Sequence, residues 1–422
     1  MLCLAALEDL ELESVDISSA FLNGELEEEV YMEQPPGFPQ GDSDQVLQLL
    51  KGLYGLKQAP RIWHRKLDTV LQSLGFIKVR CDHSIWIYRK ENVKIILPVF
   101  VDDMTIASNS KEAIQEFKAE LKKHFEIHDL GPTKFLLGVG IERDRSKREI
   151  YLSQTQYIKD LLEAQGMADC NPVSTPMDPG LKLAPDDNLL SMEEAKQYMS
   201  VVGSLLYLAT ATRPDISYTV GVLARYNSKP GMSHWKATRH LLRYLKGTMN
   251  HSLTFGPSTD NSELFKTYSD ADHGGDKSTG KSTGAYVVKM GTGAISWRSK
   301  LQPMVTLSTT EAEYISAVAA GQEIVWLRNL FSELGYQVQG TPSTLFVDNM
   351  SAISVAKNPE HHGRIKHLDL RFYWLRDEVN NGKITIQHCP TLEMPADMLT
   401  KALPRVRVQE ILPSLGLIGP SA

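Results

Sequence analysis

Adjacent aspartates at positions 102 and 103 are the first residues in this sequence with an obvious chemical use. They stand in the segment IILPVFVDDMTIAS, between two apolar runs that read as strands. Like charges side by side in an apolar setting repel each other and lose hydration, so a partner must offset the cost of keeping both ionised. A bare Asp-Asp pair is most often a surface turn, but apolar strands on both sides count against that interpretation.

A second group of acids lies in the last third of the chain, at the ends of predicted elements. Asp270 ends a strand in TYSDAD, Asp348 ends another in TLFVDN, and Asp397 lies just inside a predicted helix in EMPADMLTK. Acids at adjacent strand ends and on a covering helix are expected to converge in space. The sequence therefore predicts a carboxylate cluster at one edge of a sheet.

The segment STTEAEY offers two glutamates for the same cluster, and their spacing separates them. Ser308 and Glu311 match the capping box that begins a helix, so Glu311 is expected to cap. Glu313, half a turn further on, is free to face the sheet edge. Each acid alone is more often a surface residue, so it is the joint pattern that carries the prediction.

Four converging carboxylates cannot all stay ionised without cations. Ligation by oxygen alone suits Mg²⁺, and two Mg²⁺ ions roughly 3.5–4 Å apart suit phosphodiester hydrolysis. The second group of acids therefore favours a two-metal site, with Mn²⁺ as a possible substitute.

The composition is that of an ordinary soluble protein of two or three domains: 422 residues, 42% hydrophobic, formal net charge −6. That charge gives no whole-chain indication of a nucleic-acid partner. Four scattered cysteines without a C-x-x-C pair predict neither a zinc ribbon nor a disulfide framework, and they favour a reducing, cytosolic or nuclear setting. The longest apolar stretch, 201–211, is too short for a bilayer, and the N-terminus lacks the basic start of a signal peptide, so we expect neither membrane insertion nor secretion.

Breaks rich in Pro, Asp and Gly at 170–188 and, more weakly, at 254–264 divide the chain into three expected domains, 1–170, 190–255 and 262–405. The first mixes helix and strand, the second is mostly helical, and the third is a mixed sheet with helices packed on it. The predicted fold class is α+β. In the third domain we expect strands at 264–269, 284–290, 293–298, 344–348 and 383–388 and helices at 309–334, 350–357, 366–380 and 395–402.

A basic stripe marks the predicted helix at 234–246, HWKATRHLLRYLK. Its members recur at helical spacing: Lys236, Arg239, Arg243 and Lys246. A solvated helix face is one interpretation of the stripe. A helix laid along a nucleic-acid phosphate backbone is the other.

The third domain resembles the ribonuclease H of copia-type LTR retrotransposons. The resemblance rests on YSDADHGGDKSTGKSTGAYVV, AISWRSKLQPMVTLSTTEAEYISA, VDNMSAISVAKNPEHHGRIKHLDLRFYWLRDEV and PADMLTKALP, and it covers nearly all of 265–405. It implies that two metal ions are held and that RNA is cleaved in an RNA–DNA hybrid. The residues it assigns to that work are Asp270, Glu313, Asp348 and Asp397.

The first domain resembles the reverse-transcriptase palm of the same family, through VDISSAFLNGELEEEVYMEQPPGF, LLKGLYGLKQAPRIWHRKL, VFVDDMTIAS and LSQTQYIKDLL. The resemblance implies that Asp16, Asp102 and Asp103 hold two Mg²⁺ ions for DNA synthesis. One ion activates the primer 3′-hydroxyl and the other holds the triphosphate. It also implies an RNA template, a DNA primer and deoxynucleoside triphosphates as partners.

Further roles follow from the same resemblance. Phe21 corresponds to the steric gate against a 2′-hydroxyl, although an apolar core position is the alternative. Gly55 lets backbone approach the nucleotide, Lys57 or Gln58 contacts phosphate or base, and Gln154 belongs to a primer-grip region. The middle domain resembles the thumb and connection, a context that favours the hybrid-binding interpretation of the basic stripe.

The sequence also departs from the family pattern. In the family, fingers strands precede the aspartate that corresponds to Asp16 and supply a Lys and an Arg for the triphosphate, and protease and integrase, the enzyme of DNA integration, lie further upstream. Because Asp16 lies fifteen residues after Met1, we expect the polymerase half to be impaired and the ribonuclease H half to be complete. A cytoplasmic virus-like particle or the nucleus is the implied location. A catalytically silent nucleic-acid-binding relic and a purely structural protein are the alternatives.

Overall fold

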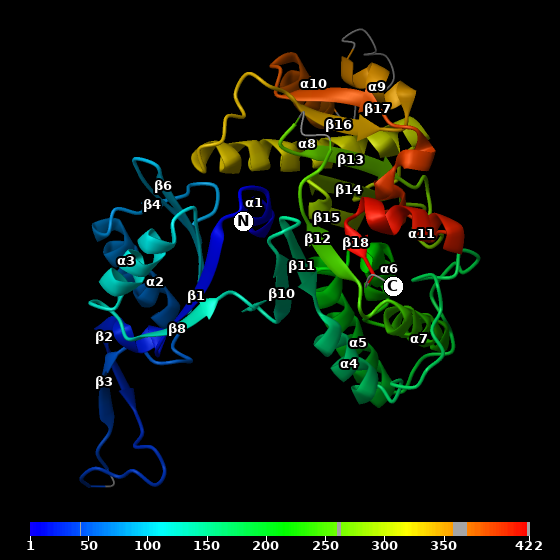
Figure 1. Cartoon of the computed structure of the whole chain (residues 1–422). Helices are drawn as coiled ribbons and strands as arrows, with labels where there is room; N and C mark the ends of the chain where they lie inside the picture. Colours follow the sequence, from blue (N-terminus) through cyan, green and yellow to red (C-terminus); the bar gives the residue numbers. More distant parts are fainter. Residues whose placement is uncertain (43, 260–262, 358–368, 420–422) are drawn as a thin grey trace. The chain divides into compact units, whose positions relative to one another are not determined.

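The structure is a computed structural model that describes residues 1–42, 44–259, 263–357 and 369–419. The chain forms two compact units (Figure 1). The first comprises Glu8–Thr133 together with Met1, and the second comprises Leu2–Leu7 and Lys134–Ala422. The boundaries expected near 170 and 260 both fall inside the second unit.

The first unit is built on a six-stranded antiparallel sheet in the order β4-β5-β6-β7-β1-β8. A separate two-stranded ribbon, β2-β3, accompanies it. The strands are β1 (Glu11–Ile17), β2 (Glu25–Met32), β3 (Leu47–Lys51), β4 (Ile77–Lys78), β5 (Ile85–Lys90), β6 (Val93–Phe100), β7 (Asp103–Ser108) and β8 (Ile127–Pro132). The 3₁₀ helix η1 (Ala20–Asn23) follows β1.

Helices α2 (Ala59–Ser73) and α3 (Lys111–Leu121) share the core of this unit with one face of the sheet. The Ser110 hydroxyl accepts the Ala113 N–H and so caps the start of α3. Side chains alternate between the two faces of a strand, so Val15 and Ile17 of β1 enter this core. The residue between them, Asp16, is therefore turned to the opposite, open face.

A buried ion cluster fixes α3 against the edge of this sheet. Lys118 of α3 is 2% exposed, and its ammonium donates to the carboxylates of Glu13 on β1 and Asp129 on β8. A buried charge is tolerated only when it is paired and hydrogen-bonded, as it is here. The cluster therefore ties β1, the strand that carries Asp16, to its neighbour β8 and to helix α3.

The second unit contains a five-stranded antiparallel sheet in the order β18-β12-β11-β10-β9. Most of the helices that accompany this sheet lie between β11 and β12 along the chain. Among the residues that the structure describes, no helix is both long and apolar enough to cross a membrane. The strands are β9 (Phe135–Leu136), β10 (Val139–Asp144), β11 (Glu149–Ser153), β12 (Ser252–Phe255) and β18 (Leu417–Ile418). The helices are α1 (Leu2–Leu7), α4 (Thr155–Ala164), α5 (Met192–Ala211), η2 (Pro214–Ile216), α6 (Ser217–Ala224), α7 (Met232–Gly247) and α11 (Arg405–Ser414).

The same unit holds a second sheet, of mixed direction, in the order β15-β14-β13-β16-β17 (Figure 1). Strands β13, β14 and β15 are antiparallel, whereas β13, β16 and β17 run parallel. All five strands lie where the sequence predicts them: β13 (Lys266–Ala271), β14 (Thr283–Met290), β15 (Gly293–Leu301), β16 (Ser343–Val347) and β17 (Ile384–His388).

The helices that accompany the mixed sheet lie where the sequence predicts them, but one of them is a 3₁₀ helix and not an α-helix. Helices α8 (Thr309–Glu333), α9 (Met350–Lys357) and α10 (Asp369–Asn380) match the expected ones, although residues 366–368 lie outside the described part of the chain. The helix expected at 395–402 is a 3₁₀ helix, η4 (Pro395–Leu399). The Thr400 N–H donates to the Asp397 carbonyl three residues earlier, at 3.2 Å, which is the bonding pattern of a 3₁₀ turn.

A buried arginine ties the helical elements of the second unit together. Arg213, 1% exposed, donates two hydrogen bonds to the Asp215 carboxylate, at 2.9 and 2.7 Å. It also donates to the carbonyl and the hydroxyl of Thr248 at the end of α7, at 3.1 and 2.6 Å. The Tyr244 hydroxyl of α7 donates to the same carboxylate at 2.7 Å. Every charge in this network is paired, which is the condition for burying an ion pair.

Removing one partner of this network is expected to destabilise the second unit strongly. Asp215→Ala leaves the buried Arg213 charge unpaired and should lower the free energy of unfolding by about 3–5 kcal/mol, as measured by urea titration. Tyr244→Phe removes one hydrogen bond to a charged group and should cost about 2 kcal/mol. The exposed Asp187→Ala is the control, and equal stability of Asp215→Ala and this control would contradict the account.

Candidate active sites

The first candidate site is the three-aspartate cluster of the first unit. Asp16 on β1 and Asp103 on β7 are direct partners in the antiparallel register. Directly opposed residues point to the same face of a sheet, so both carboxylates lie on the open face. Asp102 occupies the hairpin tip between β6 and β7, where its carbonyl accepts the Ile17 N–H at 3.1 Å. The structure thus brings the three predicted residues to one end of β1.

The turn that carries Asp102 is strained. Val101 has φ 57°, in the left-handed region that a β-branched residue rarely adopts. Its carbonyl accepts the indole N–H of the buried Trp63 of α2 at 2.8 Å. Together with the Ile17–Asp102 bond, this contact holds the turn in place and fixes where Asp102 and Asp103 stand.

The electrostatics of this cluster are those of crowded, half-buried acids. Burial, followed by the negative charges of Asp102 and Asp16, raises the pKa of Asp103. The Tyr54 hydroxyl donates to Asp102 at 3.4 Å, and burial with the Asp102 charge raises the pKa of Tyr54. In the described part of the chain, the oxygens of the three aspartates do not all come within 4.8 Å of one another. A bound cation would have to draw them closer together.

Of the residues assigned to the nucleotide, Phe21 is linked to this cluster through Tyr54. The ring of Phe21, on η1, is half-buried and lies 4.6 Å from that of Tyr54, which contacts Asp102. Gly55 has φ +102°, a conformation that glycine adopts readily, and nothing lies within 4 Å of where a Cβ would be. Lys57 is exposed, and Gln58 precedes α2 as its N-cap residue. The roles of Phe21, Gly55, Lys57 and Gln58 at the nucleotide stay predictions.

Gln154 and part of the basic stripe are engaged within the protein. Gln154 is 3% exposed in the second unit, and its Oε1 accepts the Thr212 hydroxyl at 2.7 Å, so this structure does not offer it to a nucleic acid. On α7, Lys236 and Arg239 are exposed and Lys246 is half-buried. Arg243 instead donates to the Asn171 carbonyl at 2.7 Å. The stripe is therefore partly a structural contact.

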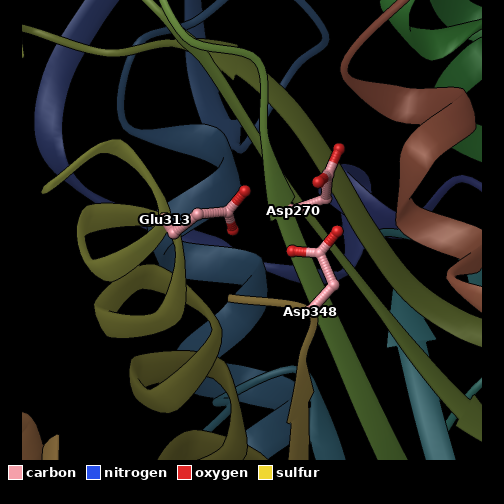
Figure 2. Close-up of side chains that lie close together, drawn as sticks. All are labelled: Asp270, Glu313 and Asp348. Atoms are coloured by element: carbon pink, nitrogen blue, oxygen red, sulfur yellow. The ribbon is translucent and has the colours of Figure 1, made fainter. Parts of the chain in front are cut away.

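The second candidate site is a group of three carboxylates in the mixed sheet of the second unit. Asp270 on β13, Glu313 on α8 and Asp348 after β16 each place an oxygen within 4.8 Å of the others. Figure 2 shows the three side chains pointing toward a common space, with Glu313 coming from the helix. Asp270 and Glu313 are 2% and 6% exposed. This convergence is what the sequence predicts for these three residues.

Glu313 has one carboxylate oxygen that no protein group contacts by a hydrogen bond. Its Oε1 accepts the Ala271 N–H at 3.2 Å, whereas its Oε2 is buried and has no hydrogen-bond partner. Burial, followed by the charges of Asp270 and Asp348, raises the pKa of Glu313 well above its ordinary value. Burial likewise raises the pKa of Asp270. Three hard oxygen ligands and one buried oxygen without a partner fit a divalent cation such as Mg²⁺.

Asp397, the expected fourth member, lies outside this group of three. Its carboxylate is 2.7 Å from the Lys401 ammonium and 3.6 Å from the Arg407 guanidinium. Lys401 also lies 3.7 Å from Asp270, and the Thr400 hydroxyl donates to Asp270. Three of the four predicted acids thus lie within 4.8 Å of one another, and Asp397 adjoins Asp270 across the Lys401 ammonium that both acids share.

Sequence reasoning missed the neighbours that set the charge of both sites. Lys401 stands four residues after Asp397, a spacing at which helical residues meet, and that signal was available in PADMLTK. Thr391, whose hydroxyl donates to Asp348 at 3.1 Å, begins the 3₁₀ helix η3 (Thr391–Glu393), and its segment carries no such signal. Tyr54 lies in the segment GLYGLKQAP but was not singled out.

Each unit carries one group of carboxylates at a sheet. The first group is three aspartates at the antiparallel sheet, and the second is three acids at the mixed sheet. Residues 1–179 match the family model described as reverse transcriptase (RNA-dependent DNA polymerase). A foamy viral protease-reverse transcriptase solved with double-stranded DNA aligns with a TM-score of 0.50 at 12% identity, over 90% of this chain and 57% of that one. This likeness shows a shared fold.

Curated relatives are closer in sequence. The retrovirus-related Pol polyprotein from transposon TNT 1-94 of Nicotiana tabacum is 44% identical, over 96% of this chain and 31% of that protein. The Pol polyprotein from transposon RE2 of Arabidopsis thaliana is 38% identical, over 96% of this chain and 28% of that protein. A transposon Ty5-1 protein of Saccharomyces cerevisiae is 34% identical, over 74% of this chain and 100% of that protein.

The chain therefore belongs to the retrovirus-related Pol polyproteins of copia-like retrotransposons and contains their reverse transcriptase domain. It spans less than a third of the length of the two plant relatives.

Stability without metal should fall as the pH rises, because the pKa of Glu313 is higher in the folded than in the unfolded state. The stabilisation from its protonation is complete below the ordinary value of 4.5 and is lost as the pH rises through the folded-state pKa. Glu313→Gln mimics the protonated form. Its advantage over wild type in EDTA should grow from pH 5 to pH 9, by about 1.4 kcal/mol per pH unit in which wild-type Glu313 stays protonated.

Urea unfolding at the two pH values measures this difference. Glu311→Gln on the same helix is the matched control, because Glu311 accepts the Leu307 N–H at the helix start and lies outside the carboxylate group. An equal pH dependence of the Glu313 variant and wild type would contradict the account.

Proposed function

We propose that the second unit is a ribonuclease H that cleaves the RNA strand of an RNA–DNA hybrid with bound divalent metal. The observation that carries this proposal is the group Asp270, Glu313 and Asp348, in which a buried glutamate oxygen has no partner. When bound, Mg²⁺ supplies Lewis-acid polarisation of the phosphate and a nucleophilic water, in the two-metal manner. Mn²⁺ is the expected substitute.

The chain's own residues position this chemistry. Asp270 and Asp348 end neighbouring parallel strands, and Glu313 is held against Asp270's strand by the Ala271 N–H. The sheet and α8 therefore fix the spacing of the ligands before any metal arrives, which lowers the cost of ordering them. Asp397 closes the side of the site next to Asp270, with Lys401 and Arg407 as its partners.

For the first unit we propose RNA-directed DNA polymerisation. Asp16, Asp102 and Asp103 would hold Mg²⁺, which activates the primer 3′-hydroxyl and neutralises the triphosphate. The reverse transcriptase family match and the pairing of Asp16 with Asp103 support this role. Phe21, beside Tyr54, would exclude a 2′-hydroxyl from the site. The partners would be an RNA template, a DNA primer and deoxynucleoside triphosphates.

The larger setting is also proposed. The relatives are polyproteins of which this chain matches a part, so protease and integrase segments would be its partners in a full-length element. The exposed Lys236 and Arg239 of α7 would contribute to hybrid binding through phosphate contacts. A cytoplasmic virus-like particle and the nucleus are the proposed locations.

Cleavage of an RNA–DNA hybrid tests the ribonuclease H proposal. Asp348→Asn removes one ligand charge and should lower the cleavage rate in Mg²⁺ by roughly a thousandfold, since metal chemistry contributes several kcal/mol. The exposed Asp377→Asn on α10 is the control and should cleave like wild type. If Asp348→Asn cleaves as fast as the control, the site assignment fails. Salt-sensitive hybrid binding without cleavage in wild type would favour the silent relic.

Primer extension on an RNA template tests the polymerase proposal separately. Asp102→Asn should lower nucleotide incorporation by roughly a thousandfold relative to wild type, while the exposed Asp42→Asn should not. Hybrid cleavage by Asp102→Asn should stay at the wild-type rate, which shows that the variant is folded. Incorporation that survives the Asp102 substitution would contradict the assignment.

A further inference from the structure

Lys401 lies between two buried carboxylates at the edge of the ribonuclease H site. Its ammonium is 2.7 Å from Asp397 and 3.7 Å from Asp270. The two acids have side chains that are 5% and 2% exposed, whereas the lysine side chain is 40% exposed. A positive charge bridging two buried acids does here what a bridging divalent cation does in a two-metal site.

The site has two sides that differ in how their carboxylates are paired. On one side, Glu313 has a buried oxygen without a partner, in the group with Asp270 and Asp348. On the other side, Asp270 accepts the Thr400 hydroxyl and faces Lys401. Asp397 forms ion pairs with Lys401 and Arg407, although its buried Oδ1 accepts no hydrogen bond. The chain supplies a cationic side chain, Lys401, between Asp270 and Asp397, on the second side of the site.

The lysine also has room to leave. It lines a pocket of about 300 Å³ in the second unit that also includes Tyr218, Asp272, Gly274 and Lys277. Lys401 has a flexible four-carbon stem, so its ammonium can move into this space without a backbone change. Asp272 and the solvent in the pocket offer it new partners.

We propose that Lys401 is a built-in counter-cation at the second metal position of this site. It holds Asp270 and Asp397 together when no metal is bound. A first divalent cation binds among Asp270, Glu313 and Asp348, and a second binds between Asp270 and Asp397 only after Lys401 has left. The two metal positions therefore have unequal affinities, and Lys401 sets the difference. This inference rests on the proposed metal-dependent ribonuclease H function.

Calorimetric titration with Mn²⁺ alone tests the inference on the full chain. Asp102 and Asp103 are replaced by Asn in every sample, so that the first unit contributes no site. The protein with Lys401 should bind one Mn²⁺ tightly and a second at least about tenfold more weakly. Lys401→Met should tighten the second event by about tenfold or more, because a competing charge has been removed. Lys401→Arg keeps the charge and should behave like the parent.

Lys300→Met is the matched control, since this exposed lysine lies on β15, two strands away from β13 in the sheet. A second measurement is the melting temperature in EDTA. Lys401→Met should melt about 4 °C or more below Lys300→Met, because Asp270 and Asp397 lose their shared cation. The two measurements have separate readouts, and neither depends on catalytic activity.

The outcomes separate the two proposals. If no sample binds Mn²⁺ tightly, or if Asp348→Asn binds like its parent, the metal site itself is wrong and the ribonuclease H proposal fails with it. If tight binding occurs but Lys401→Met leaves the second event unchanged, the lysine inference alone is overturned. Two equal sites in the parent, or equal melting temperatures in EDTA for Lys401→Met and Lys300→Met, also overturn it.

Discussion

Repulsion among the carboxylates on the mixed sheet is the constraint that the neighbouring side chains must offset. Asp270 and Glu313 are buried within 4.8 Å of each other and of Asp348, and burial raises the pKa of both. A fold can hold such a group only if protons or cations offset the charge. The neighbours supply part of that charge through Lys401, and one glutamate oxygen remains without a partner.

The first unit solves a related problem in a more open way. Its aspartates lie on the face of the sheet that the helices leave uncovered, and each is only half-buried. What it must fix is geometry, and it does so through the antiparallel register of β1 with β7 and through the strained turn at Val101. The Trp63 indole N–H donates to the Val101 carbonyl in that turn, so a core residue of α2 helps to fix where Asp102 and Asp103 lie.

The parallel direction of two strands explains why Asp270 and Asp348, far apart in the sequence, lie together in the second unit. Strands β13 and β16 are parallel neighbours although β14, β15 and α8 separate them along the chain. Parallel neighbours end on the same edge of a sheet, which brings Asp270 beside Asp348. Helix α8 crosses β13 and β14, and the Ala271 N–H holds Glu313 at that edge. The packing of one long helix on a strand thus completes the group.

Sequence pattern alone determined the five strands of the mixed sheet and the acids at the ends of its strands. Those features depend on local spacing, which a sequence records directly. The separation of Glu311 from Glu313 followed from the same kind of signal. Tertiary structure alone decided which charges neutralise which. Asp397 is paired with Lys401 and Arg407 beside the other three acids, and Gln154 is buried against Thr212. Such pairings depend on distances between elements, and no local spacing encodes those distances.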